Sequence, residues 1–365
     1  MTAGGTITTR GPQPMTDRRR TVRIGPVSGI VRSRQLLLPV VALVGLVLVS
    51  AISIGRGDYP IGLGDVLRTL VGAGDPTQQF IITELRAPRI AVGVLVGLAL
   101  GLSGALIQTF ARNPLAAPDT LGINAGASAG AVAVIVLGGG STAGGQLLGG
   151  LGLPLAALAG GLLTALLIFG LAWRGGVDGY RLILVGVGLS SVGYAAVDYL
   201  LTRSDIQDAA AATVWLTGSL NGRSWDQAWP LAVALLVLVP VALAASRQLG
   251  VLQFGDDTAR ALGVRVSLAQ AVVVLVAVAL AAIAVSAAGP VTFVALVVPQ
   301  VAVRLAGGSR PPLLASALLG ALLVVGADLL ARTVLPVALP VGIVTAVVGA
   351  PYLLWLLVRG RRALT

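Results

Sequence analysis

Long apolar runs alternate with short polar stretches along almost the whole chain. Ten of these runs approach the roughly 20 residues that one transmembrane helix needs. They lack the strict alternation of β-barrel strands, so helices are the predicted spanning elements. Spans eight and nine are short and flanked by proline. The predicted spans are residues 36–54, 89–110, 121–138, 147–173, 181–201, 229–245, 267–287, 291–306, 312–331 and 341–358.

The composition agrees with a membrane protein. Hydrophobic residues make up 56% of the 365 residues and charged residues only 11%, whereas a soluble domain carries about 25% charged residues. The apolar runs recur from one end of the chain to the other, so they do not form a single anchor on a soluble domain. The predicted fold class is an all-α polytopic membrane protein of about ten helices.

The first 35 residues have a different composition from the rest. They are rich in Arg, Gly, Pro and Thr and have no apolar period, which predicts a disordered basic tail ahead of a transmembrane domain over residues 36–360. A signal peptide is disfavoured, because the charged region is too long and no small-residue cleavage site follows a short apolar core.

The arginines predict the orientation. With the N-terminus inside, 18 of the 25 basic residues lie on the cytoplasmic side of the predicted spans and 7 lie outside, as the positive-inside rule requires. Both tails are basic and cytoplasmic, in agreement with an even number of spans in the cell membrane. The net charge of +11 is then a topology signal, and nucleic-acid binding is disfavoured. Spans two to five and seven to ten could form an inverted repeat.

Three residue types are missing from the chain: Cys, His and Lys. Without them we predict no disulfide, no thiolate or imidazole metal site and no cofactor. A phosphate-binding P-loop needs its lysine, so a separate chain would have to hydrolyse any ATP that drives this protein. A GC-rich genome could equally explain the missing lysines, and the conclusion about the P-loop holds in either case.

The segment "ARNPLAAPDTLGINAGASAGA", residues 111–131, interrupts two apolar runs with polar residues and prolines. Pro114 and Pro118 should end the second span and hold a tight cytoplasmic turn. The small residues that follow should let the third span approach its neighbours closely. A purely structural turn is one interpretation of this segment, and a gate in a transport pathway is the other.

The largest cytoplasmic connection, residues 246–270, predicts a helix of about two turns near residues 255–263. Asp256 is the expected N-cap, Asp257 suits the positive helix start, Arg260 lies near the other end and Gly263 is the expected C-cap. This helix could be an ordinary interfacial connector or a docking element that a soluble partner contacts.

The external segments carry a second group of charges. Arg332 follows Asp328 by one helical turn, so the two could form an ion pair. The alternative is that Arg86, Arg89 and Arg332 form an external basic rim for an acidic partner. Of the external tryptophans, Trp215, Trp225 and Trp229, at least two are expected in an aromatic belt. Asp198 and Asp328 lie near span ends, and no carboxylate falls near a span centre, which disfavours an ion-coupled carrier.

Four segments resemble one known family: "ELRAPRIAVGVLVGLALGLSGALIQTFARNPLAAPDTLGINAGASAGA", "LGVLQFGDDTARALGV", "AAGPVTFVALVVPQVAVRLAGG" and "ALPVGIVTAVVGAPYLLWLL". They are similar to the permease subunits of bacterial ABC importers for iron–siderophore complexes and cobalamin. The resemblance covers roughly residues 36–360 in the family's order. It implies the type II ABC importer permease fold, with ten transmembrane helices per subunit and two subunits around one pathway.

The resemblance also implies partners and site residues. Two copies of a separate ATPase would bind the cytoplasmic segment of residues 246–266, and an external binding protein would deliver the substrate. Its implied sites are a gate, contacts with the ATPase and contacts with the binding protein. The gate would include Asn113, Leu115, Asp178 and Gly179; the ATPase would contact Gly255, Asp256, Arg260, Leu262 and Gly263; and the binding protein would contact Arg86, Arg89 and Arg332.

One residue departs from the family pattern. Many members have His where this chain has Gln300. Together with "WLTGSL", this glutamine resembles the subgroup in which two different permease chains pair to import ferric siderophores. The expected function is therefore ATP-driven import of an iron chelate by a heterodimer, with no enzymatic activity in this chain. An ion-coupled carrier of a small organic solute is the alternative, and a membrane scaffold without transport is a third possibility.

Overall fold

The computed structural model describes residues 20–24, 27–31, 33–57, 59–70, 72, 74–138, 152–173, 179–252, 255–334 and 338–361. Helices account for most of them, and each predicted span coincides with one helix. These ten helices are α1 (Ser33–Gly55), α4 (Ala87–Ala111), α5 (Ile123–Leu137), α7 (Gly152–Ala172), α8 (Gly179–Thr202), α10 (Trp225–Leu252), α12 (Val266–Ala288), α13 (Val294–Ala306), α14 (Leu313–Thr333) and α15 (Val341–Arg361).

The ten helices differ in length. Among the described residues, seven helices are long and apolar enough to cross a membrane, and α5, α13 and part of α15 form shorter apolar helices. The short predicted span eight is therefore the short helix α13, whereas span nine is the full-length α14. The fold class predicted from the sequence is confirmed.

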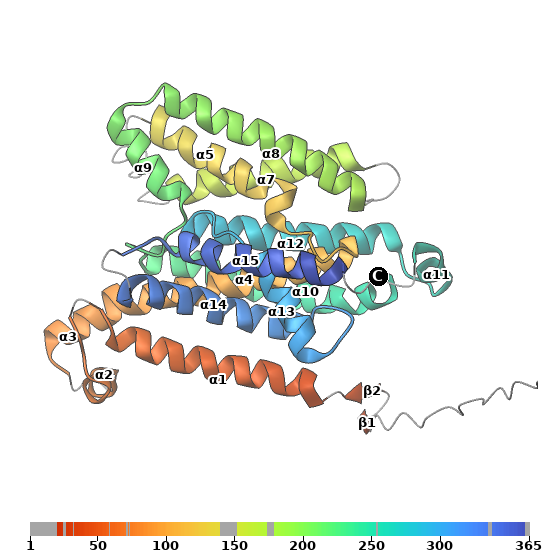
Figure 1. The fold of residues 1–365 in the computed structure, drawn as a ribbon, viewed down its shortest axis with the longest axis horizontal. Helices are drawn as coiled ribbons and strands as arrows, with labels where there is room; N and C mark the ends of the chain where they lie inside the picture. The colour runs from red at the N-terminus through yellow and green to blue at the C-terminus, as the bar shows by residue number, and fades with distance from the viewer. Residues whose placement is uncertain are drawn as a thin grey trace, which may run out of the picture.

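The helices form one elongated bundle in which α1 begins and α15 ends at the same end (Figure 1). We call this the terminal end and the other one the opposite end. Helix α1 lies on one side of the bundle along α14, and α5, α7 and α8 form a group on the other side (Figure 1). Helices α4 and α12 lie between them and are the most enclosed, whereas little of α8 is buried.

Glycine allows the closest helix contacts. A Cβ atom on Gly97 of α4 would lie 2.4 Å from the carbonyl oxygen of Gly320 in α14, and a Cβ atom on Gly126 of α5 would lie 2.7 Å from that of Gly160 in α7. Only a hydrogen atom fits at these distances, so backbones pack directly against each other as in other small-residue membrane interfaces. The close approach predicted for the third span is confirmed.

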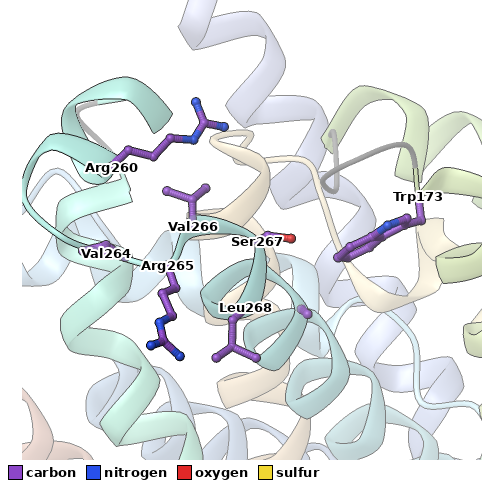
Figure 2. Close-up of a pocket in the computed structure, with 8 residues that line it drawn as sticks. Trp173, Arg260, Val264, Arg265, Val266, Ser267 and Leu268 are labelled. Carbon is purple, nitrogen blue, oxygen red and sulfur yellow. The ribbon is translucent and has the colours of Figure 1, made fainter.

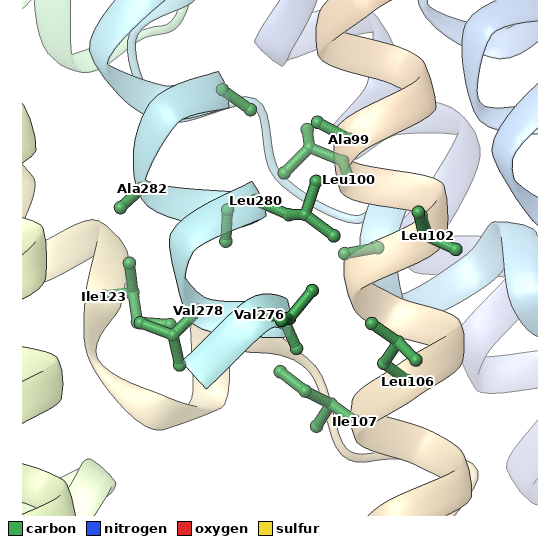
Figure 3. Packing of buried hydrophobic residues seen from close by; sticks show 14 of the residues in the cluster. Ala99, Leu100, Leu102, Leu106, Ile107, Ile123, Val276, Val278, Leu280 and Ala282 are labelled. Atoms are coloured by element: carbon green, nitrogen blue, oxygen red, sulfur yellow. The ribbon is translucent and has the colours of Figure 1, made fainter. Parts of the chain in front are cut away.

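The core is apolar and centres on α4 and α12. Leu100, Leu106 and Leu280 are almost fully buried, and Figure 3 shows α12 between α4 and the beginning of α5. Ile123, the first residue of α5, lies beside Val278 in this view. Because Val278 is in the middle of α12, α5 begins inside the bundle and not at one of its ends.

Several short elements have no counterpart among the predicted spans. At the opposite end lies the short amphipathic helix α2 (Leu63–Leu70), and α3 (Pro76–Phe80) and the π-helix η1 (Ile81–Arg86) then continue into α4. Helix α9 (Ile206–Leu216) follows α8, and the 3-10 helix η2 (Pro118–Leu121) precedes α5. One turn of π-helix often marks a functional position.

The N-terminal tail is described only in part. β1 (Arg20–Ile24) and β2 (Val27–Val31) pair as an antiparallel hairpin, with Arg20 opposite Val31. Residues 1–19 lie outside the described residues. The disorder that we expect for the first 35 residues therefore stays a prediction.

Candidate functional site

At the opposite end of the bundle, two arginines contact one buried carboxylate. Asp328 of α14 has a side chain only 5% exposed, and it accepts two hydrogen bonds from Arg89 of α4, at 2.7 Å from Nη2 and 3.1 Å from Nε. Arg332 donates to the same carboxylate from its Nε at 3.1 Å. The predicted ion pair between Asp328 and Arg332 is therefore present. Arg89, which we predicted in the external basic rim, contacts the same carboxylate.

The remaining donors of these arginines connect further elements. Nη2 of Arg332 donates to the hydroxyl of Ser53 at 2.6 Å, and its Nη1 donates to the carbonyl oxygen of Arg56 at 3.2 Å. Nη1 of Arg89 donates to the side-chain oxygen of Asn221 at 3.2 Å. The cluster thus joins α1, α4, α14 and the loop that follows α9, which limits how far the two guanidinium groups can turn outward.

Arg86 is more buried than the other two arginines. It is the last residue of η1, is 8% exposed, and donates to the carbonyl oxygens of Ile54 at 2.6 Å and of Tyr59. Its side chain holds the end of α1 and the following segment against the start of α4. Of the three predicted rim residues, Arg86 therefore presents the least surface to a partner.

At the terminal end, α4 stops in a tight turn. Arg112 takes the left-handed conformation, with φ of 50°, and the side-chain oxygen of Asn113 accepts the backbone N–H of Leu115 at 2.9 Å. Ala116 donates its N–H to the carbonyl of Asn113 at 3.2 Å. The side chain of Asn113 therefore stabilises the turn, while Leu115 remains half-buried.

The beginning of α8 lies beside this turn. A Cβ atom on Gly179 would come within 3.3 Å of the Cα atom of Ala111, so the structure brings three of the four predicted gate residues to one place. Asp178 lies outside the described residues. The role of all four residues as a gate stays a prediction.

The predicted cytoplasmic helix is present as α11 (Asp256–Ala261). Its N-cap is Gly255, with φ of 100°, and not Asp256 as we expected, because a glycine can take the positive φ that this chain reversal requires. At the other end Gly263 has φ of 80°, and Val264 donates its N–H to Ala259 at 3.0 Å. The C-cap of α11 is therefore Leu262 and not Gly263 as we expected, and Gly263 takes the left-handed conformation one residue later, where glycine is favoured.

A pocket of about 520 Å³ lies between α11, the start of α12 and the end of α7. Figure 2 shows Arg260 and Arg265 on one side of this pocket and Trp173 on the other. Arg260 pairs with Asp257 at 2.8 Å, but both side chains are largely exposed, and exposed pairs of this kind contribute little to stability. The terminal end therefore offers basic groups that a partner can reach.

Gln300, the departure from the family pattern, is part of a polar contact inside the bundle. Its Nε2 donates to Oε1 of Gln108 at 2.7 Å, and Nε2 of Gln108 donates to the carbonyl oxygen of Leu296 at 2.9 Å. These bonds connect the last turns of α4 with α13. No group of three or more Asp or Glu side chains that could hold a metal ion occurs in the described part of the chain.

Sequence reasoning missed several of these residues. Asp328 was expected to meet Arg332 only, because a residue 239 positions away leaves no local signal for Arg89. Of the external tryptophans, Trp215 is buried at 6% exposure, unlike a residue of an aromatic belt. The indole nitrogen of the half-buried Trp225 donates to the carbonyl of Thr83 at 3.0 Å, a contact that the sequence did not predict. Trp229 is 66% exposed, as a belt residue would be.

The fold and these two ends define a class of protein: a polytopic helical transport subunit that has a polar cluster at one end and a short exposed helix at the other. A family model for the FecCD transport family matches residues 43–359. The chain is 39% identical to the ferric enterobactin transport system permease protein FepG of Escherichia coli (strain K12), over 90% of this chain and 98% of that protein.

A second relative and a solved structure agree. The iron(3+)-hydroxamate import system permease protein FhuG of Bacillus subtilis (strain 168) is 38% identical, over 90% of this chain and 98% of that protein. A solved inward-facing structure of a transporter assigned to the metal-chelate type of ABC transporter is 28% identical to this chain and superposes with a TM-score of 0.77. The match covers 89% of this chain and 99% of the chain in that structure. The chain therefore belongs to the FecCD transport family, and it is a multi-pass permease of an ABC importer.

Proposed function

We propose that this chain is one of two permease subunits that together carry an intact ferric siderophore across the cell membrane, with the energy supplied by a separate ATPase. The observation that carries the proposal is the match over residues 43–359, together with two relatives that are named for iron chelates and match over 90% of this chain. The two chelates differ, so the kinship supports a class of substrate and not one compound.

The residues of this chain fit a chelated metal as the cargo. The sequence contains no His and no Cys, so the walls of the pathway have neither imidazole nor thiolate with which to take iron from its ligands. A siderophore that keeps its own oxygen ligands needs only a passage of suitable size. Small and apolar side chains are sufficient to line such a passage.

The proposed orientation places both tails and α11 in the cytoplasm. The chain has no lysine and hence no P-loop, so ATP would bind on the partner that contacts Gly255, Asp256, Arg260, Leu262 and Gly263. The pocket beside α11 adds Trp173 and Arg265 to that surface. Reversal of the orientation would place the basic residues on the wrong side of the membrane.

The binding protein would dock at the opposite end, on the external side. Arg89 and Arg332 keep 17% and 13% of their side chains exposed while they hold Asp328. The exposed parts of these two side chains are positively charged, which suits contact with carboxylates on an acidic partner surface. Arg86 would act mainly by fixing the beginning of α4.

The second permease subunit would cover the open face of α8. Leu184, Val187, Val192, Tyr194 and Tyr199 are all at least 50% exposed there. We expect a different chain at this position, because Gln300 and the segment "WLTGSL" resemble permeases that work in unlike pairs. Copurification of the chain with its genomic neighbours would identify the partner.

The test is uptake of radiolabelled iron by proteoliposomes that contain this chain, its partner permease and the ATPase. We expect uptake that requires both ATP and the loaded binding protein, with iron supplied in parallel as a catecholate, a hydroxamate and a citrate complex. A matched variant, Leu115→Asp, should assemble but block or leak transport if the turn after α4 is a gate. Uptake driven by an ion gradient without ATP would contradict the proposal and favour the alternative carrier.

A further inference from the structure

One face of α12 is exposed, although this helix is among the most enclosed in the bundle. Leu268 is 58% exposed and Leu275 is 45% exposed, whereas most other residues of α12 are buried. The two leucines are separated by about two turns of the helix, so they lie on the same face. We call the face from Leu268 to Leu275 the apolar strip. Because α12 is long and apolar enough to cross a membrane, the strip lies at membrane depth.

The same face of α12 has a pocket at each end of the bundle. Leu268 and Ala271 line the pocket of about 520 Å³ at the terminal end, and Ile283 and Ser286 line a smaller one of about 100 Å³ at the opposite end. Residues of α7 and α10 also line the smaller pocket. Both of these helices pack against α12 and are long enough to cross a membrane. The strip is therefore flanked by membrane-spanning helices and leads into the larger pocket.

The larger pocket is basic. Arg260 and Arg265 line it, and none of its described lining residues is acidic. Arg260 pairs with Asp257, whose side chain is fully exposed and outside the pocket lining. The side chain of Arg265 is exposed, and it makes no hydrogen bond or ion pair within the described part of the chain. The pocket therefore offers guanidinium donors to an anion.

Trp173, at the end of α7, lies across the pocket from these arginines (Figure 2). Its ring is 4.9 Å from that of Phe169, and the residue is 38% exposed. Tryptophan at the end of a spanning helix is typical of the headgroup region of a membrane. Figure 2 also shows Arg265 beside Leu268, with both side chains on the same side of α12. The basic pocket thus meets the apolar strip at the level where lipid headgroups lie.

An anionic phospholipid matches both the pocket and the strip. Its phosphate accepts hydrogen bonds from guanidinium groups, which bind phosphate in a forked geometry, and its acyl chain can cover the apolar strip. The volume of the pocket lies in the range of roughly 300–1,000 Å³ that small-ligand sites have. A free phosphate would leave the strip uncovered. An acidic segment of a soluble partner would not reach Leu275, which is about 10 Å further into the membrane than Leu268.

We propose that the pocket between α7, α11 and α12 binds the headgroup of one anionic phospholipid from the cytoplasmic leaflet, with an acyl chain along Leu268 and Leu275. The inference rests on the proposed function only for the orientation, which places this end of the bundle at the cytoplasm. Basic pockets between spanning helices on this side of a membrane are known lipid sites in other proteins. Since Arg260 and Arg265 also belong to the surface proposed for the ATPase, the bound headgroup forms part of that surface.

The first test measures lipid binding to the purified full-length chain by native mass spectrometry, with phosphatidylglycerol as the anionic probe and phosphatidylcholine as the zwitterionic one. We expect one tightly bound phosphatidylglycerol per chain. Arg265→Gln should weaken its binding about fivefold, the contribution of one arginine at an anionic membrane surface, and Arg265→Lys should retain most of the affinity. Arg310→Gln, at an exposed arginine of the same end that does not line the pocket, is the matched control.

A second measurement separates the lipid from a free anion. Glycerol phosphate carries the same phosphate without acyl chains, so it should displace phosphatidylglycerol only weakly. Leu275→Ala shortens the apolar strip outside the pocket, and it should weaken the binding of phosphatidylglycerol without changing the competition by glycerol phosphate. Leu236→Ala, at a leucine of α10 that is 77% exposed, is the control for loss of an exposed apolar side chain.

Three outcomes would overturn the inference. Equal affinity for the two phospholipids would mean that the arginines do not hold a headgroup. Glycerol phosphate that competes as strongly as the lipid would reduce the pocket to an anion site. Complete release of the lipid when the ATPase and the partner permease are added would assign the pocket to a protein partner. Absence of ATP-dependent uptake in the wild-type complex, with lipid binding intact, would contradict the proposed function alone.

Discussion

The two ends of the bundle hold their charges in opposite ways. At the opposite end, Asp328 is buried and holds Arg89 and Arg332, and further donors of these arginines contact α1 and the loop after α9. At the terminal end, Arg260 pairs with Asp257, a residue of the same short helix that is fully exposed. The first arrangement is part of the fold, whereas the second can be exchanged for contacts with a partner.

This difference separates stability from recognition. Loss of a group from the Asp328 cluster should lower the stability of the whole subunit, because the cluster bonds α1, α4, α14 and the loop after α9 to one another. Loss of a group from α11 should leave the fold intact and change only what binds there. Four predictions, taken from the largest expected effect on stability to the smallest, test this comparison.

Asp328→Asn should have the largest effect. It removes the buried carboxylate that both guanidinium groups contact, and the loss of one member of a buried ion pair costs roughly 3–5 kcal/mol. Chemical or thermal unfolding of the purified subunit measures the loss, with Asp65→Asn, in the exposed pair with Arg68, as the control. If both variants unfold at the same denaturant concentration, the cluster does not hold the helices together.

Arg86→Met should come second. The carbonyl oxygens of Ile54 and Tyr59 would lose a donor, and a buried group left without its partner costs about 1–3 kcal/mol. The same unfolding measurement applies, and Arg56→Met, at an exposed side chain, should change the unfolding free energy by less than about 0.5 kcal/mol. An Arg86 variant as stable as the Arg56 variant would instead favour a direct docking role for Arg86.

Gly263→Val should weaken α11 and leave the bundle unchanged. Its φ of 80° is unfavourable for a β-branched residue, at a cost of about 1–2 kcal/mol. Hydrogen exchange should become faster for the amides of α11 and stay unchanged in α4 and α12. Ala261→Val, two residues earlier and at the last position of α11, is the control. Faster exchange throughout the bundle would mean that α11 supports the fold.

Asp257→Asn and Arg260→Gln should have the smallest effect on stability. Both break the same exposed pair, which contributes little to stability, so unfolding should not change measurably. Binding of the ATPase, measured by titration at two salt concentrations, should weaken for Arg260→Gln. An unfolding free energy lowered as far as in Asp328→Asn would remove the distinction between the two ends.

Much of the candidate site could be predicted because its signals are local. The proline and asparagine of residues 113–118 predict a turn, and Gly255 to Gly263 predict a short helix, since both depend on backbone preferences within a few residues. The N-cap was misplaced by one position, because Gly255 and Asp256 both suit a helix start. The spacing from Asp328 to Arg332 predicts their pair for the same local reason.

Contacts between distant segments could not be predicted in this way. The bond from Arg89 to Asp328 joins residues 239 positions apart, and nothing near either residue selects the other. The π-helix before α4 and the buried position of Trp215 depend on how neighbouring elements pack.

The sequence by itself determined that the chain lies in a membrane and how many helices it forms. A helix that crosses lipid must satisfy its own backbone and be apolar along its length, and a run of consecutive residues shows both properties. Only the tertiary structure decided where α5 and α13 begin, which carboxylate holds which arginine, and which charges stay accessible. These features depend on the distances between helices, and the apolar runs that build the helices are too similar to one another to encode which of them meet.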